Sequence, residues 1–459
     1  MRKATQRSSK DATRQGASET EFRESGVSWL GRIPTHWSLQ RLRYALSTNP
    51  SHSEIDDLPV DTEVSFVPMD AIGEYGGLNL SQSKRIDEIG AGFTYFRDGD
   101  VVVAKITPCF ENWKGAHVTG LLNSIGFGTT ELHVLRPRKS LDARFLFYIT
   151  LSDAFRRLGE AEMYGAGGQK RVPDTFIRDL EWPLPPFAEQ HVIARSLDAE
   201  TEAIDRVITK HEYLRELLST HRREFVARAV TRGLSEDVRL QESFIEWLGP
   251  VPEHWRVTKM RHVSSASSGG TPSKEDPEFW GGNFPWVTPK DMKRRLIASA
   301  EDAVTARALT ETALRLFEPN AVLIVVRGMI LAHSFPVALT TERVTINQDM
   351  KALRFAAEVH PEFAAWYLEG VGKRILRTIV EEAGHGTRVV RMDEWKSVPI
   401  PIPPLQEQRE IVDAINSETD RIDSLLKNVT HALSRLVEYR RTVISNAVTG
   451  KTDLRTRAP

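Results

Sequence analysis

Residues 187–231 read FAEQHVIARSLDAETEAIDRVITKHEYLRELLSTHRREFVARAVT, and residues 405–449 read LQEQREIVDAINSETDRIDSLLKNVTHALSRLVEYRRTVISNAVT. Aligned without a gap, the two stretches share 13 of 45 positions, so the chain contains an internal duplication. Neither stretch contains glycine or proline, and the apolar residues recur at helical spacing. Each stretch therefore predicts one uninterrupted helix, roughly 60 Å long at the rise of an α-helix.

Apolar positions alternate at spacings of three and four residues along both predicted helices. They are Ile204, Val207, His211, Leu214, Leu218, His221 and Phe225 in the first helix and Ile422, Leu425, Val429, Ala432, Leu436, Tyr439 and Val443 in the second. This pattern predicts coiled-coil packing of the two helices, the alternative being two unrelated surface helices. We expect the spacer and its partner contacts to rest on Ile204, Leu218, Ile422, Leu425 and Leu436.

The duplication extends outward from the helices at a constant offset of 218 residues. Before each helix lies a tryptophan-rich motif, Trp29-Leu30-Gly31, Pro34, His36 and Trp37 in the first half and Trp247-Leu248-Gly249, Pro252, His254 and Trp255 in the second. At each helix start lies a proline-rich motif, Pro183, Pro185, Pro186, Glu189 and Gln190 or Pro401, Pro403, Pro404, Glu407 and Gln408. We interpret His36 and His254 as structural, because they repeat with their aromatic neighbours.

The regions between these motifs, residues 25–186 and 243–404, predict two globular domains with a mixed α+β fold. The β-branched runs at 101–104 and 322–326 predict strands, and residues 146–158 and 363–379 predict helices. Residues 1–24 lack a hydrophobic pattern and predict a disordered tail. Residues 232–242 predict a polar linker, and residues 450–459 a C-terminal tail after helix termination by Gly450.

The composition fits a multi-domain protein of the cytoplasm. Hydrophobic residues make up 40% and charged residues 27%, and no apolar run approaches the length of a membrane-spanning helix. The single cysteine, Cys109, cannot form an internal disulfide. The net charge is -1, from 61 basic and 62 acidic residues, so binding to nucleic acid would have to use local basic patches.

Sequence motifs of catalysis are not found. Leu184-Pro185-Pro186-Phe187 lacks the leading Asn or Asp of a methyl-transfer motif, and Gly450-Lys451-Thr452 lacks the earlier glycine of a phosphate-binding loop. Glu394-Trp395-Lys396 matches a nuclease tripeptide that is common by chance. The histidines show no zinc spacing. We therefore interpret the chain as a binding protein without a catalytic or metal site.

The two copies of Trp-Leu-Gly-x-x-Pro-x-His-Trp, each followed by a variable domain, Pro-x-Pro-Pro-x-x-Glu-Gln and a long helix, resemble the specificity subunit of type I restriction-modification systems. The resemblance covers nearly all of the chain after residue 24. It implies two target recognition domains, each reading one half of a split DNA site, and an antiparallel helical spacer. It also implies two modification subunits and additional restriction subunits as partners. S-adenosylmethionine, ATP and Mg would be used on those subunits, and no cofactor in this chain.

Candidate DNA contacts follow from side-chain chemistry at equivalent places in the two domains. Glycines in Gly167-Gly168-Gln169-Lys170-Arg171 and Gly384-His385-Gly386-Thr387-Arg388 permit close backbone approach, and the cations can meet phosphates. Gln169 can hydrogen-bond a base edge, preferably of adenine. The basic candidates outside these loops are Lys105, Arg327, Lys290, Lys293, Arg294 and Arg295. A solvated turn or surface is the alternative for each group.

Two further hypotheses stay open on the sequence alone. In one, the chain is a coiled-coil assembly scaffold whose globular domains bind proteins, which the near-neutral charge favours. In the other it is a stand-alone enzyme, which the missing motifs disfavour. Salt-dependent binding to random DNA separates the first from a specificity subunit.

Overall fold

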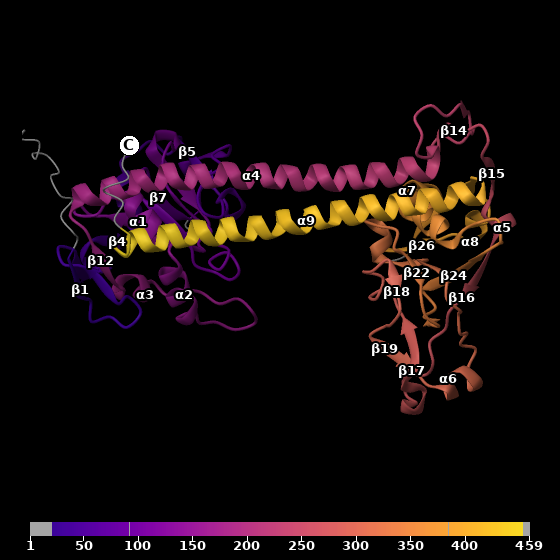
Figure 1. Cartoon of the computed structure of the whole chain (residues 1–459). Coiled ribbons are helices and arrows are strands. Elements are labelled where there is room, and N and C mark those ends of the chain that lie inside the picture. Colours follow the sequence, from indigo (N-terminus) through magenta and orange to yellow (C-terminus); the bar gives the residue numbers. More distant parts are fainter. Residues whose placement is uncertain (1–20, 91, 384, 453–459) are drawn as a thin grey trace, which may run out of the picture. The chain divides into compact units, whose positions relative to one another are not determined.

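The computed structural model describes residues 21–90, 92–383 and 385–452 (Figure 1). These residues fall into two compact units, Met1–His211 with Ala432–Pro459 and Glu212–His431, called unit 1 and unit 2 below. The two predicted long helices are confirmed as α4 (Phe187–Arg232) and α9 (Leu405–Val448). Each helix has one end in unit 1 and the other end in unit 2. None of the described helices is long and apolar enough to cross a membrane.

The globular domain of unit 1 is built on two four-stranded sheets among its described residues. Their strand orders are β6 (Ser83–Arg85), β5 (Glu63–Val67), β10 (Ile125–Gly128) and β7 (Thr94–Arg97), and β4 (Leu46–Thr48), β11 (Leu132–Pro137), β8 (Val101–Ala104) and β9 (Gly115–His117). The helices are α1 (Ala143–Thr150), α2 (Asp153–Ala161) and α3 (Asp174–Asp179). Most strand pairs are antiparallel and β10 pairs with β5 in parallel, so the α+β prediction is confirmed.

The globular domain of unit 2 contains one five-stranded and two three-stranded sheets among its described residues. The first has the order β16 (Ser264–Ser268), β24 (Met350–Phe355), β20 (Val322–Val325), β22 (Val337–Thr340) and β18 (Leu296–Ile297). The others are β19 (Asp302–Val304), β17 (Trp280–Val287) and β23 (Thr345–Ile346), and β21 (Arg327–Gly328), β26 (Thr387–Val390) and β25 (Val380–Ala383). Helices are α5 (Met260–Val263), α6 (Ala306–Glu311), α7 (Pro361–Ile379) and α8 (Met392–Trp395).

The ends of the long helices complete the hydrophobic cores of the domains. Ile193 and Leu197 of α4 and Ile444 and Val448 of α9 are buried in the core of the first domain. The opposite ends are buried in the core of the second domain, with Val226, Val230, Ile411 and Ile415. The predicted boundaries between domain and helix, at 186/187 and 404/405, are therefore not boundaries between hydrophobic cores. Each core includes residues from both long helices.

The seam between the helices agrees with the prediction at most positions and differs at five. The predicted positions that are buried or half-buried are Ile204, His211, Leu218, Phe225, Ile422, Val429, Ala432, Leu436 and Val443, whereas Val207, Leu214, His221, Leu425 and Tyr439 are exposed. Of these five, His221 and Tyr439 still contact the opposite helix, at Glu418 and Glu200. The residues that follow these exposed positions and do lie in the seam include Ile208, Arg222, Leu426 and Arg440. Leu425, with 40% of its surface exposed, is thus wrong as a seam residue.

Two arginines explain why an apolar pattern misplaced the seam. The long apolar stem of an arginine can pack in a seam while its charged end reaches a partner. Arg222 Nε lies 3.0 Å from Asp423 Oδ1 on the opposite helix in unit 2. In unit 1, Arg440 Nε lies 2.8 Å from Asp205 Oδ1. Both helices therefore pack through mixed apolar and ionic contacts within each unit.

The repeated motifs form the same clamp in both halves. His36 Nε2 and Trp37 Nε1 contact the Glu189 carboxylate at 2.8 and 3.1 Å. In the second half, His254 and Trp255 contact Glu407 at 2.8 and 3.0 Å. The structural interpretation of both histidines agrees with these contacts, since each joins the start of a domain to the first turn of a long helix.

The strands beside the motifs close each domain on itself. β3 (Ser38–Arg41) pairs antiparallel with β12 (Glu181–Leu184), and β15 (Arg256–Lys259) pairs with β27 (Pro399–Ile402). Each pair joins the first and last segments of a domain directly before its long helix. Each repeat of 218 residues therefore consists of one closed domain and the long helix that follows it.

Three predicted boundaries are wrong. Residues 22–24 belong to β1 (Phe22–Glu24), which pairs with β2 (Arg32–Pro34), while residues 1–20 of the expected tail lie outside the described part. The expected linker contains β13 (Leu240–Gln241), paired with β14 (Val251–Pro252). The helix expected at 146–158 is two helices, because Ser152 accepts a hydrogen bond from Phe155 N and caps α2. Residues 453–459 also lie outside the described residues.

Candidate DNA interface

The first domain gathers four of the predicted contacts, three on one loop and the fourth at a neighbouring strand end. Lys105 follows β8, and its N–H donates to Glu131 O at 2.9 Å. Thr107 N donates to Lys170 O at 2.9 Å, which holds the glycine-rich loop against this strand end. Tyr164 and Arg171 close that loop through reciprocal backbone hydrogen bonds of 3.2 and 2.8 Å. Gln169 and Lys170 lie exposed within it.

Arg171 has an acidic partner inside the domain. Its Nε and Nη2 donate to the two carboxylate oxygens of Glu131 at 2.9 and 2.8 Å. The hydrogen bonds from Arg171, together with the charges of Arg171 and Lys105, hold the pKa of Glu131 below its usual value. A bidentate pair of this kind fixes the position of the guanidinium and offsets its charge. Lys105 and Lys170 form no ion pair with any residue in the described part of the chain, so they supply the positive charge of this site that is not held in a pair.

The second domain places its equivalent residues on a three-stranded sheet. Arg327 begins β21, where it pairs with Val389 of β26, and Gly328 pairs with Arg388. β26 forms a hairpin with β25, and Thr387 lies at its tip opposite Ala383. Arg327 N donates to Asp349 O at 3.3 Å, as Lys105 N does to Glu131 O in the first domain. Residue 384 of the predicted loop lies outside the described residues.

The basic cluster at 290–295 is divided by the structure. Lys290, Lys293 and Arg294 are exposed between β17 and β18. Arg295 instead donates to Glu362 Oε1 at 2.6 Å and to Asn416 Oδ1 at 3.2 Å, and its guanidinium lies 4.2 Å from the centre of the Trp366 ring. It joins the loop to α7 and α9, so its prediction as a DNA contact is wrong.

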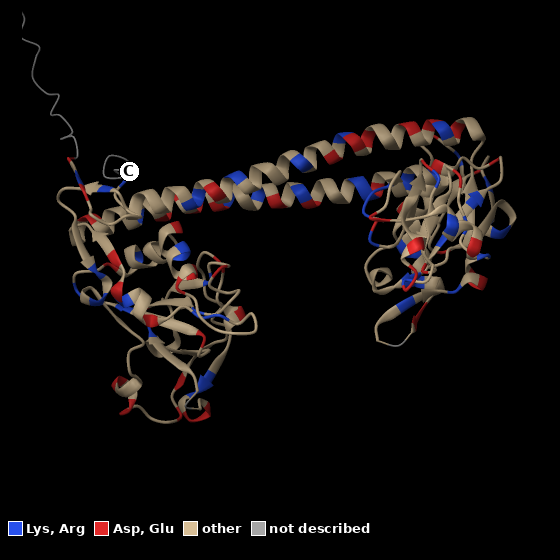
Figure 2. Ribbon diagram, turned by 90° about the horizontal axis from the view of Figure 1, so that it is seen from below, with Lys and Arg blue, Asp and Glu red and all other residues tan. Residues whose placement is uncertain are grey.

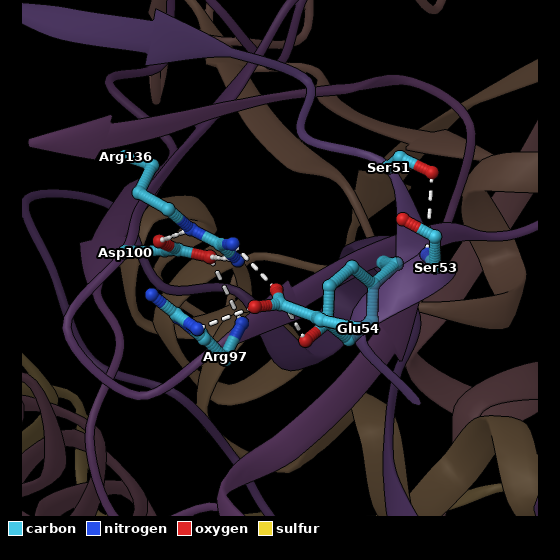
Figure 3. A network of polar contacts seen from close by, with 7 residues as sticks. Ser51, Ser53, Glu54, Arg97, Asp100 and Arg136 are labelled. Atoms are coloured by element: carbon cyan, nitrogen blue, oxygen red, sulfur yellow. Dashed lines mark hydrogen bonds and ion pairs between the residues drawn. The ribbon is translucent and has the colours of Figure 1, made fainter. Parts of the chain in front are cut away.

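Arg136, on β11 of the first domain, also has a structural role (Figure 3). Its Nε and Nη2 donate to the two oxygens of buried Asp100, both at 2.8 Å. Nη1 reaches Glu54, which also accepts from Arg97 and from Tyr95 OH. Burial and the hydrogen bond to Glu54 raise the pKa of Tyr95 to about 12. The network joins strand ends of both sheets and leaves Arg136 little free charge.

Charge is mixed over both domains and both long helices (Figure 2). The first domain, residues 25–186, has 17 basic and 20 acidic residues, and the second, residues 243–404, has 20 and 19. A DNA surface in this chain must therefore be local. In the described residues, no three His, Cys, Asp or Glu side chains lie close enough to hold a metal ion.

Sequence reasoning missed the residues that organise these sites. Glu131 is not among the residues selected from sequence, although it binds the Arg171 guanidinium and the Lys105 backbone. Tyr164, exposed at the base of the glycine-rich loop, was not selected at all. Its place directly before the loop was the available signal, because aromatic side chains at loop bases can contact bases or sugars.

Comparison with known proteins connects this architecture to DNA specificity. The family profile described as "Type I restriction modification DNA specificity domain" matches residues 93–212 and 252–433, more than half of the chain. The specificity subunit of the Escherichia coli type I restriction enzyme EcoAI is 40% identical over 163 residues, which are 35% of this chain and 27% of that subunit. The EcoR124I/EcoR124II specificity subunit of the same organism is 37% identical over 175 residues, 38% and 42% of the two chains.

A solved structure supports the same fold over nearly the whole chain. It comes from a study of complex assembly and conformational transition of the type I R-M system, with a TM-score of 0.73 and 18% identity. The similarity covers 92% of this chain and 99% of that one. The matched region spans less than half of the EcoAI and EcoR124I subunits, and the family assignment rests on the profile match over both halves of the chain. With both matched regions and the duplicated fold in agreement, the chain belongs to the type I restriction-modification DNA specificity family.

Proposed function

We propose that this chain is the DNA-specificity subunit of a type I restriction-modification complex. Each globular domain reads one half of a bipartite site, and the chain itself carries no catalytic centre. The observation that carries the proposal is the pair of equivalent basic sites, Lys105 with the 164–171 loop and Arg327 with the β25–β26 hairpin, in two family-matched domains. Double-stranded DNA is the partner that such cations and exposed amides suit.

The target is expected to be asymmetric. Gln169 and Lys170 are presented by a glycine loop in the first domain, whereas Thr387 and Arg388 lie on a regular hairpin in the second. Different side chains on different local backbones at corresponding places of the two domains favour different bases. Exchange of residues 25–186 for another domain of the family should therefore change only one half of the site.

The long helices are proposed to set the distance between the half-sites and to dock the modification subunits. Each helix is continuous, over 46 residues for α4 and 44 for α9, which supports a stiff connection. In unit 2, Tyr213, Leu214 and Leu217 of α4 and Leu425 of α9 expose apolar surface to solvent. Exposed apolar side chains concentrated on one helix favour a protein partner.

The chemistry of the complex is assigned to other subunits. Two modification subunits would bind S-adenosylmethionine, and restriction subunits would use ATP and Mg. Near-neutral domains favour weak DNA binding by the isolated chain, with the modification subunits contributing phosphate contacts. The expected compartment is the cytoplasm, where the DNA and these partners are available.

Mapping of methylated adenine tests the proposal directly. Cells would carry the modification partner with or without this chain, and the expected result is a split, asymmetric motif that appears only with the chain. Unchanged methylation with a verified modification complex would contradict the proposal. The scaffold hypothesis would then lead, with DNA binding that does not fall with salt as its signature.

The spacer role has its own test. Leu218→Asp combined with Leu436→Asp places two carboxylates at half-buried seam positions, which should loosen the helix pair and abolish methylation at the spaced site. Asn428→Asp, at an exposed position of α9, is the charge control and should leave methylation unchanged. Full methylation of the same spaced motif by the double variant would contradict the spacer role.

A further inference from the structure

Two neighbouring apolar residues are exposed beside the arginines of the second domain. Met329 and Ile330 open the short 3-10 helix η7 (Met329–Ala332), which follows β21 directly. Their surfaces are 65% and 43% exposed, while the next residue, Leu331, is buried in the domain core. Single exposed apolar residues are ordinary, but an adjacent pair on a protruding turn requires an explanation.

The backbone holds this pair in a fixed position. The preceding residue, Gly328, pairs with Arg388 across the β21–β26 ladder. His333 N and Ser334 N both donate to Ile330 O, each at 3.0 Å. η7 also packs against β26. The two apolar side chains are therefore presented from a braced turn, which lowers the entropy lost on binding.

The surrounding charge favours an anionic partner. Arg327 directly precedes the pair, is exposed, and forms no ion pair within the described residues. Arg388 of β26 lies directly opposite Glu382 of β25, so Arg327 on the edge strand β21 is the cation farther from the β25 carboxylates. Exposed apolar side chains beside such an arginine suit DNA, with apolar contact to bases and cationic contact to phosphates.

The first domain lacks this chemistry at the equivalent turn. After Lys105, the residues are Ile106 and Thr107; Ile106 is half-buried and bridges to Arg171. The Thr107 hydroxyl donates to Lys170 O at 3.3 Å. The exposed apolar pair is thus a feature of the second domain alone, and not a requirement of the duplicated fold.

We propose that Met329 and Ile330 contact the 5-methyl group of a thymine in the major groove of the half-site read by the second domain. Arg327 would contact a flanking phosphate. The thymine methyl is the one apolar group that the major groove offers, so an apolar contact distinguishes A·T from other base pairs there. This inference rests on the proposed function and specifies what the second domain reads.

The test uses the assembled modification complex and short duplexes carrying the motif found by methylation mapping. Each thymine of the second half-site is replaced in turn by deoxyuridine, which removes only the methyl group. Loss of one buried methyl should weaken binding by about three- to five-fold at one position. Met329→Ala with Ile330→Ala should abolish this difference between thymine and deoxyuridine. Leu296→Ala, at another exposed apolar position of the same domain, is the matched control and should preserve it.

Distinct outcomes separate the inference from the proposed function. If no thymine replacement affects the wild-type complex, or if the effect persists in the double variant, the methyl contact is refuted. A second half-site without any A·T pair would refute it as well. Equal weakening of all sequences by the double variant would indicate insertion between base steps and would also overturn the contact. The absence of any chain-dependent motif would instead refute the proposed function.

Discussion

Replacement of Gln190 by alanine should destabilise unit 1 by about 3 kcal/mol and leave unit 2 unchanged. Gln190 is almost fully buried in the first turn of α4. Its Oε1 accepts from Asp142 N at 2.8 Å, and its Nε2 donates to Ser140 O and Pro185 O at 3.0 and 2.9 Å. One side chain thereby joins the long helix, the proline-rich turn and the start of α1.

The magnitude follows from the three hydrogen bonds that the variant loses. A net contribution of roughly 1 kcal/mol for each bond gives the expected value. Asp142 also caps α1, since its Oδ1 accepts from Phe145 N at 2.9 Å. This cap does not involve Gln190 directly, so it remains in the variant. Loss of a side chain at a helical position costs little by itself, because alanine has the better helix propensity.

The duplication supplies a matched variant. Gln408 accepts from His360 N at 2.7 Å and donates to Glu358 O and Pro403 O at 2.8 and 2.9 Å. Gln408→Ala should therefore destabilise unit 2 by a similar amount and leave unit 1 unchanged. Gln406→Ala is the control, because Gln406 is exposed and its side chain donates to Glu410 on its own helix. Its effect should stay below about 0.5 kcal/mol.

Hydrogen exchange in increasing urea resolves the two units. Peptides from α1 report on unit 1, and peptides from α7 report on unit 2. The expected result is earlier opening of α1 alone in Gln190→Ala and of α7 alone in Gln408→Ala. A change below about 0.5 kcal/mol in Gln190→Ala, or equal opening of both helices, would refute the reasoning about this hydrogen-bonded centre.

Three further predictions concern single residues. Burial lowers the pKa of His133, so the unfolded chain binds the proton more tightly, and unit 1 should lose stability as the pH falls below about 6.5. Urea midpoints measured against pH should show a smaller loss in His133→Gln. Equal pH dependence of the two proteins would contradict this prediction. Phe244 is 96% exposed and has a positive φ of 56°, at the place where the first half has Gly26 with φ 78°. Its side chain gains nothing from packing and its backbone is strained, so Phe244→Gly should leave the melting temperature unchanged or raise it. A clear decrease in melting temperature would disprove the backbone strain. Glu131→Gln removes the charged partner of Arg171 and frees its guanidinium for a phosphate. The slope of log binding constant against log salt concentration, measured for DNA binding by the complex, should become steeper by roughly one counterion. An unchanged slope would show that Arg171 does not contact a phosphate.

Local patterns were sufficient for the architecture. The two long helices were predicted within one residue at their C-terminal ends, because long segments without glycine or proline leave few other options. The strands at 101–104 and 322–325 were predicted by β-branched residues. The break near Ser152 was missed, since a serine cap inside an apolar run is visible only once its partner is known.

The candidate site was predicted in part. Lys105 with the 164–171 loop and Arg327 with Arg388 were selected from sequence, and the fold brings each group together. Arg295 was wrongly included, because sequence cannot show that Glu362 and Trp366, more than sixty residues away, receive its charge.

The sequence by itself determined the duplication, the order of domain and helix, the α+β class and the set of basic candidates. These depend on local spacing, composition and repetition, which are properties of the linear chain. Tertiary structure alone decided which helix face forms the seam, which cations have acidic partners and where Met329 and Ile330 are exposed. Such outcomes depend on contacts between residues distant in sequence, because a side chain's free charge or exposed surface is what remains after its neighbours have packed against it.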